Sequence, residues 1–257
     1  MAKHSPLQWG LLGLIQGITE FLPVSSTAHL NLMRQKLKQK PDLTVDTALH
    51  LGSLAATLLW VLRHRKQLPL QDPHFWGKGV IATLPTGVAG LAFEKPLQRW
   101  RHPQVTALML IAGGLGLLFT EYCRPPRETS LRTLSYGQAA RIGAAQSLAL
   151  IPGLSRSGMT QMAGQWQGLN GEASQQFSFL LAIPVVTASA LFEMRHLPLQ
   201  EHKQMLPGIL SAGLSSYLML EKVSFFASGK PYRALAYYRV ALGTYLWKKA
   251  RKGKTRR

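Results

Sequence analysis

Two short polar segments inside apolar sequence carry the side chains best suited to chemistry in this chain. The first, GLIQGITEFLPVSSTAH, covers residues 13–29, and the second, GAAQSLALIPGLSRSGMTQ, covers residues 143–161. Each holds a glutamine, then a proline break, then a group of hydroxyls. Buried polar groups need hydrogen-bonding partners, so apolar segments seldom carry so many without a function. Together they supply an acid, an imidazole, a guanidinium and several hydroxyls, the groups that a phosphate-handling site needs.

The first segment places a carboxylate and an imidazole around a predicted helix break. Gln16 and Glu20 are four residues apart and share a helix face. Pro23 breaks the helix, and a hydroxyl can cap the next one: Ser25, Ser26 or Thr27. Glu20 suits either a divalent cation held by oxygen ligands or a general base, and His29 suits a proton carrier or a nucleophile. The alternatives are a solvated carboxylate at a helix end and a structural imidazole.

The second segment predicts an anion site at the start of a helix. Pro152 and Gly153 end one helix, and the sequence SRSG at 155–158 opens the next. Free N–H groups and the positive end of the helix dipole attract phosphate at such a start. Arg156 adds a forked set of donors, and Thr160 follows it on the same helix face. The alternative is an ordinary helix cap with an exposed arginine.

Helices must position these groups, and the sequence predicts helices throughout. Strict alternation of apolar and polar residues is scarce, and the apolar stretches are rich in Leu, Ala and Gly. Proline and glycine breaks separate ten predicted helices: 7–22, 26–38, 45–65, 76–93, 103–122, 136–150, 157–167, 171–194, 205–226 and 232–252. The predicted fold is therefore all-α, in a single domain over residues 1–257. His50 and Asp46 fall in an apolar helix. His50 could reach the site from there, although a structural role is the preferred interpretation, and Asp46 suits the N-terminus of that helix.

The order of features suggests pseudo-repeats at about 1–122 and 136–250. In each half, a broken apolar segment precedes a loop and a long apolar helix. Gln16 precedes Pro23 by seven residues, and Gln146 precedes Pro152 by six. Paired interrupted segments indicate an inverted-repeat membrane fold with its site at the repeat interface. Chance similarity among segments rich in Gly, Ser and Leu is an equal alternative.

Composition narrows the class of partner. Thirty Lys and Arg against eleven Asp and Glu give a formal charge of +19, which favours phosphate partners. Nucleic acid is not expected, because zinc-finger spacing and aromatic RNA-binding signatures are missing. Residues 173–192 carry no acidic or basic side chain over 20 residues, the length that spans a bilayer. The single cysteine, Cys123, excludes an intrachain disulfide, and we expect no cleavable signal peptide.

The two segments resemble the signature regions of the undecaprenyl-diphosphate phosphatase family, polytopic bacterial membrane enzymes linked to bacitracin resistance. GLIQGITEFLPVSSTAHL and PGLSRSGMT carry the resemblance, and DTALHLGSLAA, FSFLLAIP and YYRVALG extend it along the chain. It implies hydrolysis of undecaprenyl diphosphate to the monophosphate carrier lipid of cell-wall synthesis. It also implies a membrane helix bundle with inverted-topology repeats and two re-entrant helix pairs. That bundle would lie in the bacterial inner membrane, with its site facing the outer side.

The resemblance also implies roles for individual residues. Glu20 would be the essential acid and the ligand of a divalent cation, Mg²⁺ or Ca²⁺. Ser26, His29 and Arg156 would join it in catalysis, with the nucleophile open among His29, Ser26 and an activated water. Substrate binding is assigned to the remaining polar positions: Gln16, Ser25, Thr27, Ser155, Ser157, Gly158 and Thr160. Many family members carry Glu where Gln16 stands, which puts a two-carboxylate cation site in doubt.

Two other functions fit parts of this pattern. The mean hydropathy is only +0.02, and residues 31–40 are strongly basic, as in a polar-surface, solubilised analogue of the fold with little activity. An inverted repeat with broken helices also fits a flippase or transporter of a lipid carrier. The expected partners are a polyprenyl diphosphate lipid and membrane lipids, and a homodimer is compatible with the fold.

Overall fold

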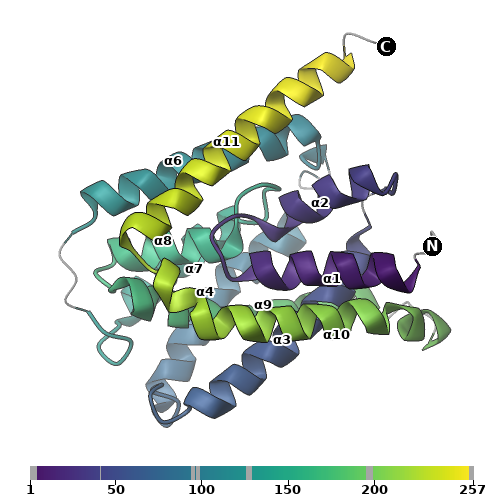
Figure 1. Ribbon diagram of the computed structural model, residues 1–257. Coiled ribbons are helices and arrows are strands. Elements are labelled where there is room, and N and C mark those ends of the chain that lie inside the picture. The colour runs from purple at the N-terminus through teal and green to yellow at the C-terminus, as the bar shows by residue number, and fades with distance from the viewer. Residues whose placement is uncertain are drawn as a thin grey trace. The chain divides into compact units, whose positions relative to one another are not determined.

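The computed structural model describes residues 5–40, 42–93, 96, 99–125, 129–194 and 199–254. Within these residues the chain is helical, and the only strand-like feature is an isolated bridge between Thr129 and Leu169. The helices in chain order (Figure 1) are α1 (Pro6–Glu20), α2 (Ser26–Lys36), α3 (Leu43–His64), α4 (Pro73–Ala92), α6 (Pro103–Cys123), α7 (Tyr136–Leu148), α8 (Arg156–Trp166), α9 (Gly171–Met194), α10 (Leu199–Lys222), the 3₁₀ turn η1 (Val223–Phe226) and α11 (Gly229–Lys254). The all-α prediction is confirmed.

All ten predicted helices are present, and the largest difference is at α10. It begins at Leu199 rather than 205 and ends at Lys222, where η1 follows. The charged residues at 201 and 203 lie inside the helix, although the prediction began at the apolar run. Hydrophobic periodicity identifies the part of a helix that packs against other helices. It does not mark polar first turns, which also belong to the helix.

The helices that open the two polar segments begin with the same cap. Ser5 Oγ accepts from the Gln8 N–H at 3.3 Å, while Gln8 Oε1 accepts from the Ser5 N–H at 3.0 Å. Ser135 and Gln138 repeat this arrangement at the start of α7, at 3.2 and 2.7 Å. Each pair satisfies two backbone donors that the helix leaves unbonded. The sequence therefore sets where α1 and α7 start.

The chain forms two compact units, each assembled from separate stretches. The first comprises Met1–Phe21, Ser26–Leu68 and Phe179–Val223, and the second comprises Leu22–Ser25, Pro69–Ser178 and Ser224–Arg257. Within the first unit α1 packs against α10, which also packs against α3; within the second, α7 packs against α4, and α11 against α6. The single domain expected from the sequence stays a prediction.

Glycines let helices approach closely inside each unit. A Cβ at Gly13 would collide with the carbonyl oxygen of Gly208 and lie 2.9 Å from the Ala212 nitrogen. In the second unit, a Cβ at Gly143 would meet the Ala82 backbone in the same way. The α1–α10 and α4–α7 pairs therefore pack backbone to backbone, as small residues permit between membrane helices.

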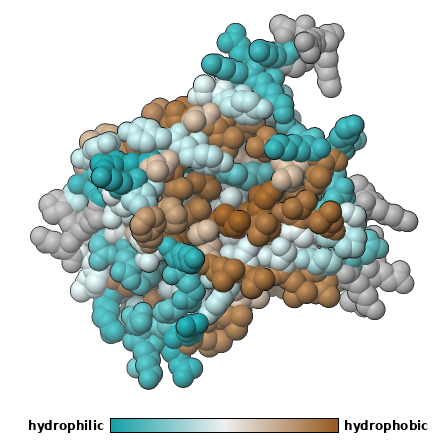
Figure 2. Space-filling view, in the orientation of Figure 1, coloured by the Kyte–Doolittle hydropathy of each residue, from teal (hydrophilic) through white to brown (hydrophobic). Residues whose placement is uncertain are grey.

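Apolar side chains cover the outer faces of several helices. Helix α10 exposes a row of leucines at a four-residue spacing: Leu206, Leu210, Leu214 and Leu218. Figure 2 shows brown, hydrophobic side chains along α10. Three helical stretches are long and apolar enough to cross a membrane: Thr44–His64, Pro103–Cys123 and Gly171–Leu191. These features fit a membrane protein and disfavour the solubilised analogue, whose exposed positions would be polar.

Replacing Gly13 with alanine tests the close α1–α10 contact. Gly13→Ala should lower the free energy of unfolding by about 1–3 kcal/mol, because α1 must move away from α10. Gly10→Ala, one turn earlier on the same helix, is the control, since a Cβ there meets nothing within 4 Å. It should be neutral or stabilising by up to about 1 kcal/mol. Thermal unfolding in detergent measures both, and equal melting temperatures would contradict the close contact.

Candidate functional site

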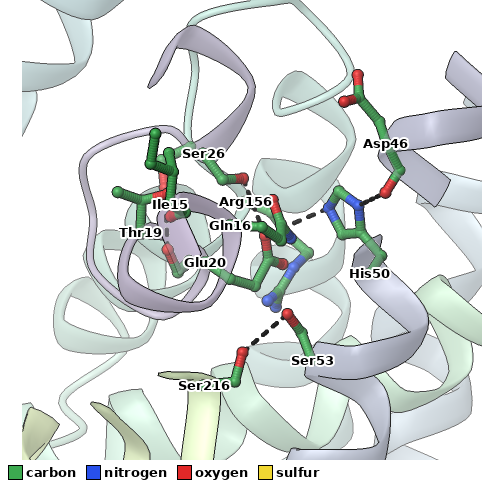
Figure 3. A network of polar contacts seen from close by, with 12 residues as sticks. Ile15, Gln16, Thr19, Glu20, Ser26, Asp46, His50, Ser53, Arg156 and Ser216 are labelled. Carbon is green, nitrogen blue, oxygen red and sulfur yellow. Dashed lines mark hydrogen bonds and ion pairs between the residues drawn. The ribbon is translucent and has the colours of Figure 1, made fainter. Parts of the chain in front are cut away.

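The Glu20 carboxylate is the centre of a polar cluster in the first unit (Figure 3). Glu20 is the last residue of α1 and is only 7% exposed. Its Oε2 accepts from Gln16 Nε2 at 3.0 Å and from Ser26 Oγ at 2.9 Å. The same oxygen lies 3.3 Å from His50 Nε2. The predicted pairing of Gln16 with Glu20 on one helix face is confirmed, and Ser26 joins it across the break.

His50 reaches this cluster from α3. Its Nδ1 lies 2.6 Å from the backbone carbonyl oxygen of Asp46. A carbonyl only accepts, so Nδ1 carries the hydrogen, and Nε2 is the nitrogen that faces Glu20. The Asp46 carboxylate in turn pairs with Arg34 at 2.7 Å, and that arginine is 1% exposed. A buried ion pair between α2 and α3 thus anchors the backbone that orients His50.

Two other predicted residues of the first segment lie elsewhere on α2. His29 lines a pocket of about 160 Å³ between α1 and α2, and the pocket's other walls are mostly apolar: Ile15, Ile18, Thr19, Leu32, Met33 and Lys36. Thr27 is half-buried in the first turn of α2. An apolar pocket beside an imidazole suits an uncharged ligand segment better than a phosphate group.

The second segment forms the start of α8 in the second unit, as predicted. Ser155 caps the helix, and its Oγ accepts from the Gly158 N–H at 3.2 Å. The same Oγ lies 2.9 Å from Ser157 Oγ, which donates to the Leu22 carbonyl at 2.8 Å. These hydroxyls therefore tie the α8 start to the break after α1, the Leu22–Ser25 stretch of the same unit.

Arg156 and Thr160 share one neighbour on α9. Arg156 Nη1 donates to the Ser178 carbonyl at 2.8 Å, and Thr160 Oγ1 donates to Ser178 Oγ at 2.7 Å. The guanidinium is thereby oriented at a helix N-terminus, where the dipole already favours an anion. Thr160 is 1% exposed, so its hydroxyl supports the arrangement around Arg156.

A buried arginine of α11 holds both helix breaks. Arg239 is fully buried; its Nη1 donates to the Pro23 carbonyl at 2.8 Å and its Nη2 to the Gly153 carbonyl at 3.0 Å. Near those carbonyls the backbone is left-handed, at Ser25 (φ 70°) and at Gly153 (φ 103°). For serine this conformation is costly and persists only where its surroundings enforce it.

The structure therefore brings the predicted residues together in two groups, and adds residues that sequence reasoning missed. Gln16, Glu20 and Ser26 cluster in the first unit, while the second unit holds the α8 start (Ser155, Arg156, Ser157, Gly158, Thr160) and Ser25. The added residues are Arg239, which sequence reasoning missed, and His50, for which it preferred a structural role. The sequence signal for His50 as a site residue is a lone imidazole four residues after an acid in an apolar helix. The signal for Arg239 is its place in the YYRVALG stretch, which is part of the family resemblance.

The donors around Glu20 do not fit a divalent cation. Magnesium and calcium prefer six or more oxygen ligands, mostly carboxylates, carbonyls and water. Here one carboxylate oxygen already takes an amide N–H, a hydroxyl and an imidazole. Among the described residues no group of three His, Cys, Asp or Glu is arranged to hold a metal. The expected Mg²⁺ or Ca²⁺ stays a prediction.

Arg239→Ala tests whether that guanidinium holds the two breaks. The change leaves two buried carbonyls without donors and should cost about 2–5 kcal/mol of unfolding free energy. Lys248→Ala removes an exposed cation from the same helix and should change stability by less than about 0.5 kcal/mol. Thermal unfolding in detergent compares them. Equal stability of the two variants would show that the Arg239 contacts are dispensable.

Comparison with known proteins covers nearly the whole chain. A family model described as bacitracin resistance protein BacA matches residues 10–245. The undecaprenyl-diphosphatase of Moorella thermoacetica is 34% identical over 251 residues, 93% of this chain and 96% of that protein. The undecaprenyl-diphosphatase of Bordetella avium is 34% identical over 262 residues, covering 90% and 92% of the two chains. Both polar segments lie inside the matched region, and the chain belongs to the BacA family of bacitracin resistance proteins.

Proposed function

We propose that this chain hydrolyses undecaprenyl diphosphate to undecaprenyl phosphate and inorganic phosphate. The observation that carries this proposal is the family match over residues 10–245, which includes both the Glu20 cluster and the Arg156 helix start. Related proteins that match over most of their length are named undecaprenyl-diphosphatase. The reaction recycles the carrier lipid for cell-wall synthesis and so confers resistance to bacitracin.

Arg156 and the start of α8 bind the diphosphate in this proposal. A guanidinium and helix N-terminal N–H groups neutralise charge on the phosphoryl group during transfer. Ser178 orients Arg156 through its carbonyl, at 2.8 Å. The cap and the Ser157 bond to Leu22 keep the helix start in place, so these hydroxyls pre-organise the anion site.

Glu20 acts as the general base. A hydroxyl that donates to a carboxylate has the arrangement of a nucleophile with its base, and Ser26 Oγ lies 2.9 Å from Glu20 Oε2. A water in the same place would be activated equally. The attacking oxygen bonds to the terminal phosphorus, and the bond from that phosphorus to the bridging oxygen breaks. The lipid monophosphate leaves, and Glu20 holds the proton from the attacking group. If Ser26 attacks, water then releases the phosphate from it.

We also assign to the chain the inverted-topology repeat with two re-entrant helix pairs. A constant offset of 130 residues supports it, because α2 (Ser26–Lys36) and α8 (Arg156–Trp166) then coincide. The capping boxes, the close-packed glycines and the buried glutamines follow the same offset: Ser5 and Ser135, Gly13 and Gly143, Gln16 and Gln146. The pairs α1–α2 and α7–α8 are the re-entrant candidates, since each is short and interrupted.

Location in the bacterial inner membrane, with the site open to the outer side, completes the proposal. Three helical stretches have the length and apolar composition of membrane spans. A polyprenyl diphosphate is itself held in the bilayer, so an enzyme acting on it gains from being embedded there.

Glu20→Gln should reduce the rate of phosphate release from undecaprenyl diphosphate in detergent at least 100-fold, because the base is lost while the side-chain shape is kept. Glu172→Gln, an exposed acid on α9, is the control and should keep the normal rate. Colorimetric detection of phosphate measures both. Normal turnover by Glu20→Gln would remove Glu20 from the mechanism.

Arg156→Ala should lower kcat/KM at least 100-fold, because the diphosphate loses its main cation. The control is Arg141→Ala, which removes an exposed arginine that bonds Gln167 and should leave turnover unchanged. Wild-type protein that binds the lipid diphosphate but releases no phosphate would favour a flippase over the hydrolase.

A further inference from the structure

We infer that the first unit carries a binding site for an anionic phospholipid, built from the groove between α1 and α2 and the lysines that follow it. The ammonium groups of Lys36, Lys38 and Lys40 bind the phosphate of the headgroup, and an acyl chain lies in the apolar part of the groove. Such binding depends on the proposed membrane location but not on the proposed hydrolysis.

The groove is the pocket of about 160 Å³ between α1 and α2. Its only polar group on α1 is the Thr19 hydroxyl, which donates to the Ile15 carbonyl at 2.6 Å and so needs no partner in the pocket. An apolar cavity of about 150 Å³ holds a benzene molecule, so this pocket has room for a hydrocarbon segment of about six carbons. It suits part of a lipid chain and not a phosphate group.

The pocket lies on a different face of α1 from the polar cluster around Glu20. Figure 3 shows Ile15 and Thr19 on the side of α1 away from His50. Ile18, which also lines the pocket, is 38% exposed. The pocket therefore opens on the outside of the unit, where a membrane lipid can reach it.

Three lysines lie at the end of this groove where α2 stops. Lys36 itself lines the pocket, and Lys36, Lys38 and Lys40 are all exposed. The chain turns back here, because the Gln39 N–H donates to the Arg34 carbonyl at 2.8 Å and Lys38 is left-handed at φ 56°. The turn keeps the three cations at one end of α2.

Nearby acids do not neutralise these lysines. Asp42 caps α3 by accepting from two backbone N–H groups, and Asp46 pairs with the buried Arg34 at 2.7 Å. Among the residues that the structure describes, Lys36, Lys38 and Lys40 form no ion pair. Clustered basic side chains beside a membrane attract anionic lipids. The charge of the site therefore favours a headgroup with net negative charge.

The order of groups along α2 matches the order of groups in a phospholipid. Met33, Leu32 and His29 line the pocket on the Ser26 side of Lys36. Helix α2 has 11 residues, so Lys36 lies about 15 Å along its axis from Ser26. That is about half of a hydrocarbon core of about 30 Å. With the lysines at the membrane surface, the apolar pocket lies below them at the depth of the acyl chains.

The test measures lipid binding to the full-length protein in detergent by native mass spectrometry. The probes are dioleoyl phosphatidylglycerol, which is anionic, and dioleoyl phosphatidylcholine, which has the same chains and no net charge. The wild type should bind the anionic lipid at least tenfold more tightly. Farnesyl phosphate is a third probe, because it joins a phosphate to an isoprenoid chain.

Two kinds of variant separate the headgroup contact from the chain contact. Lys36→Gln with Lys38→Gln should weaken phosphatidylglycerol binding at least tenfold, since each lysine near the surface contributes about fivefold. The control is Arg65→Gln with Lys66→Gln, which removes two exposed cations of the same unit and should change affinity less than threefold.

Leu32→Trp fills the pocket and should weaken binding of phosphatidylglycerol at least fivefold. Leu62→Trp, at an exposed position of α3, is its control and should leave the affinity unchanged. The lysine double variant should release phosphate from undecaprenyl diphosphate at the wild-type rate, which shows that its fold is intact.

Equal affinity of the wild type for the two phospholipids would overturn the inference, as would equal phosphatidylglycerol affinity of the wild type and the lysine double variant. Farnesyl phosphate should bind both proteins equally. If the lysine variant instead weakens farnesyl phosphate and leaves phosphatidylglycerol unchanged, the groove holds a prenyl phosphate and the inference is wrong. If the wild type releases no phosphate from undecaprenyl diphosphate, the proposed function fails, and the lipid titrations still decide this site.

Discussion

The bonds from one buried guanidinium to two backbone carbonyls are the constraint on which both polar segments depend. The breaks after α1 and α7 lie outside the helices, so their buried backbone carbonyls need donors from elsewhere in the chain. Arg239 binds the carbonyls of Pro23 and Gly153 together. Gly113 and Gly158 make room for it, because a Cβ at either would crowd the guanidinium. The dipoles of these carbonyls therefore stabilise the buried cation. Among the described residues, no carboxylate pairs with it.

The two segments use the same local plan for different chemistry. Gln146, buried on α7, donates to the Ala82 carbonyl at 3.3 Å and to Thr86 Oγ1 at 3.1 Å, so it joins two helices. Gln16, at the matching place on α1, donates instead to the Glu20 carboxylate. Gln146 therefore stabilises the packing of two helices, whereas Gln16 is part of the polar cluster around Glu20. The difference arises because an acid follows Gln16 by one turn, whereas Leu150 follows Gln146.

Local features of the fold could be predicted from sequence, and long-range ones could not. Proline breaks and Ser–Gln caps act within four residues, so the starts of α1 and α7 and the Gln16–Glu20 pairing are readable from spacing. His50 meets Glu20 only because α3 packs beside α1, and Arg239 is more than 200 residues from Pro23. The family resemblance implies that Ser157 and Thr160 bind the substrate, and this assignment stays a prediction. In the structure both hydroxyls bond protein acceptors, which a list of residue types does not reveal.

The Arg239 contacts also mark a position at which the two halves of the proposed repeat differ. With an offset of 130 residues the partner position of Arg239 is Met109, whose carbonyl lies 3.5 Å from Nη2 of that same arginine. Two identical halves would bring either two guanidiniums to this place or none, and a second cation would repel the first. Arginine at one position and methionine at the other give the contact a single guanidinium, so the two halves are not interchangeable at this place.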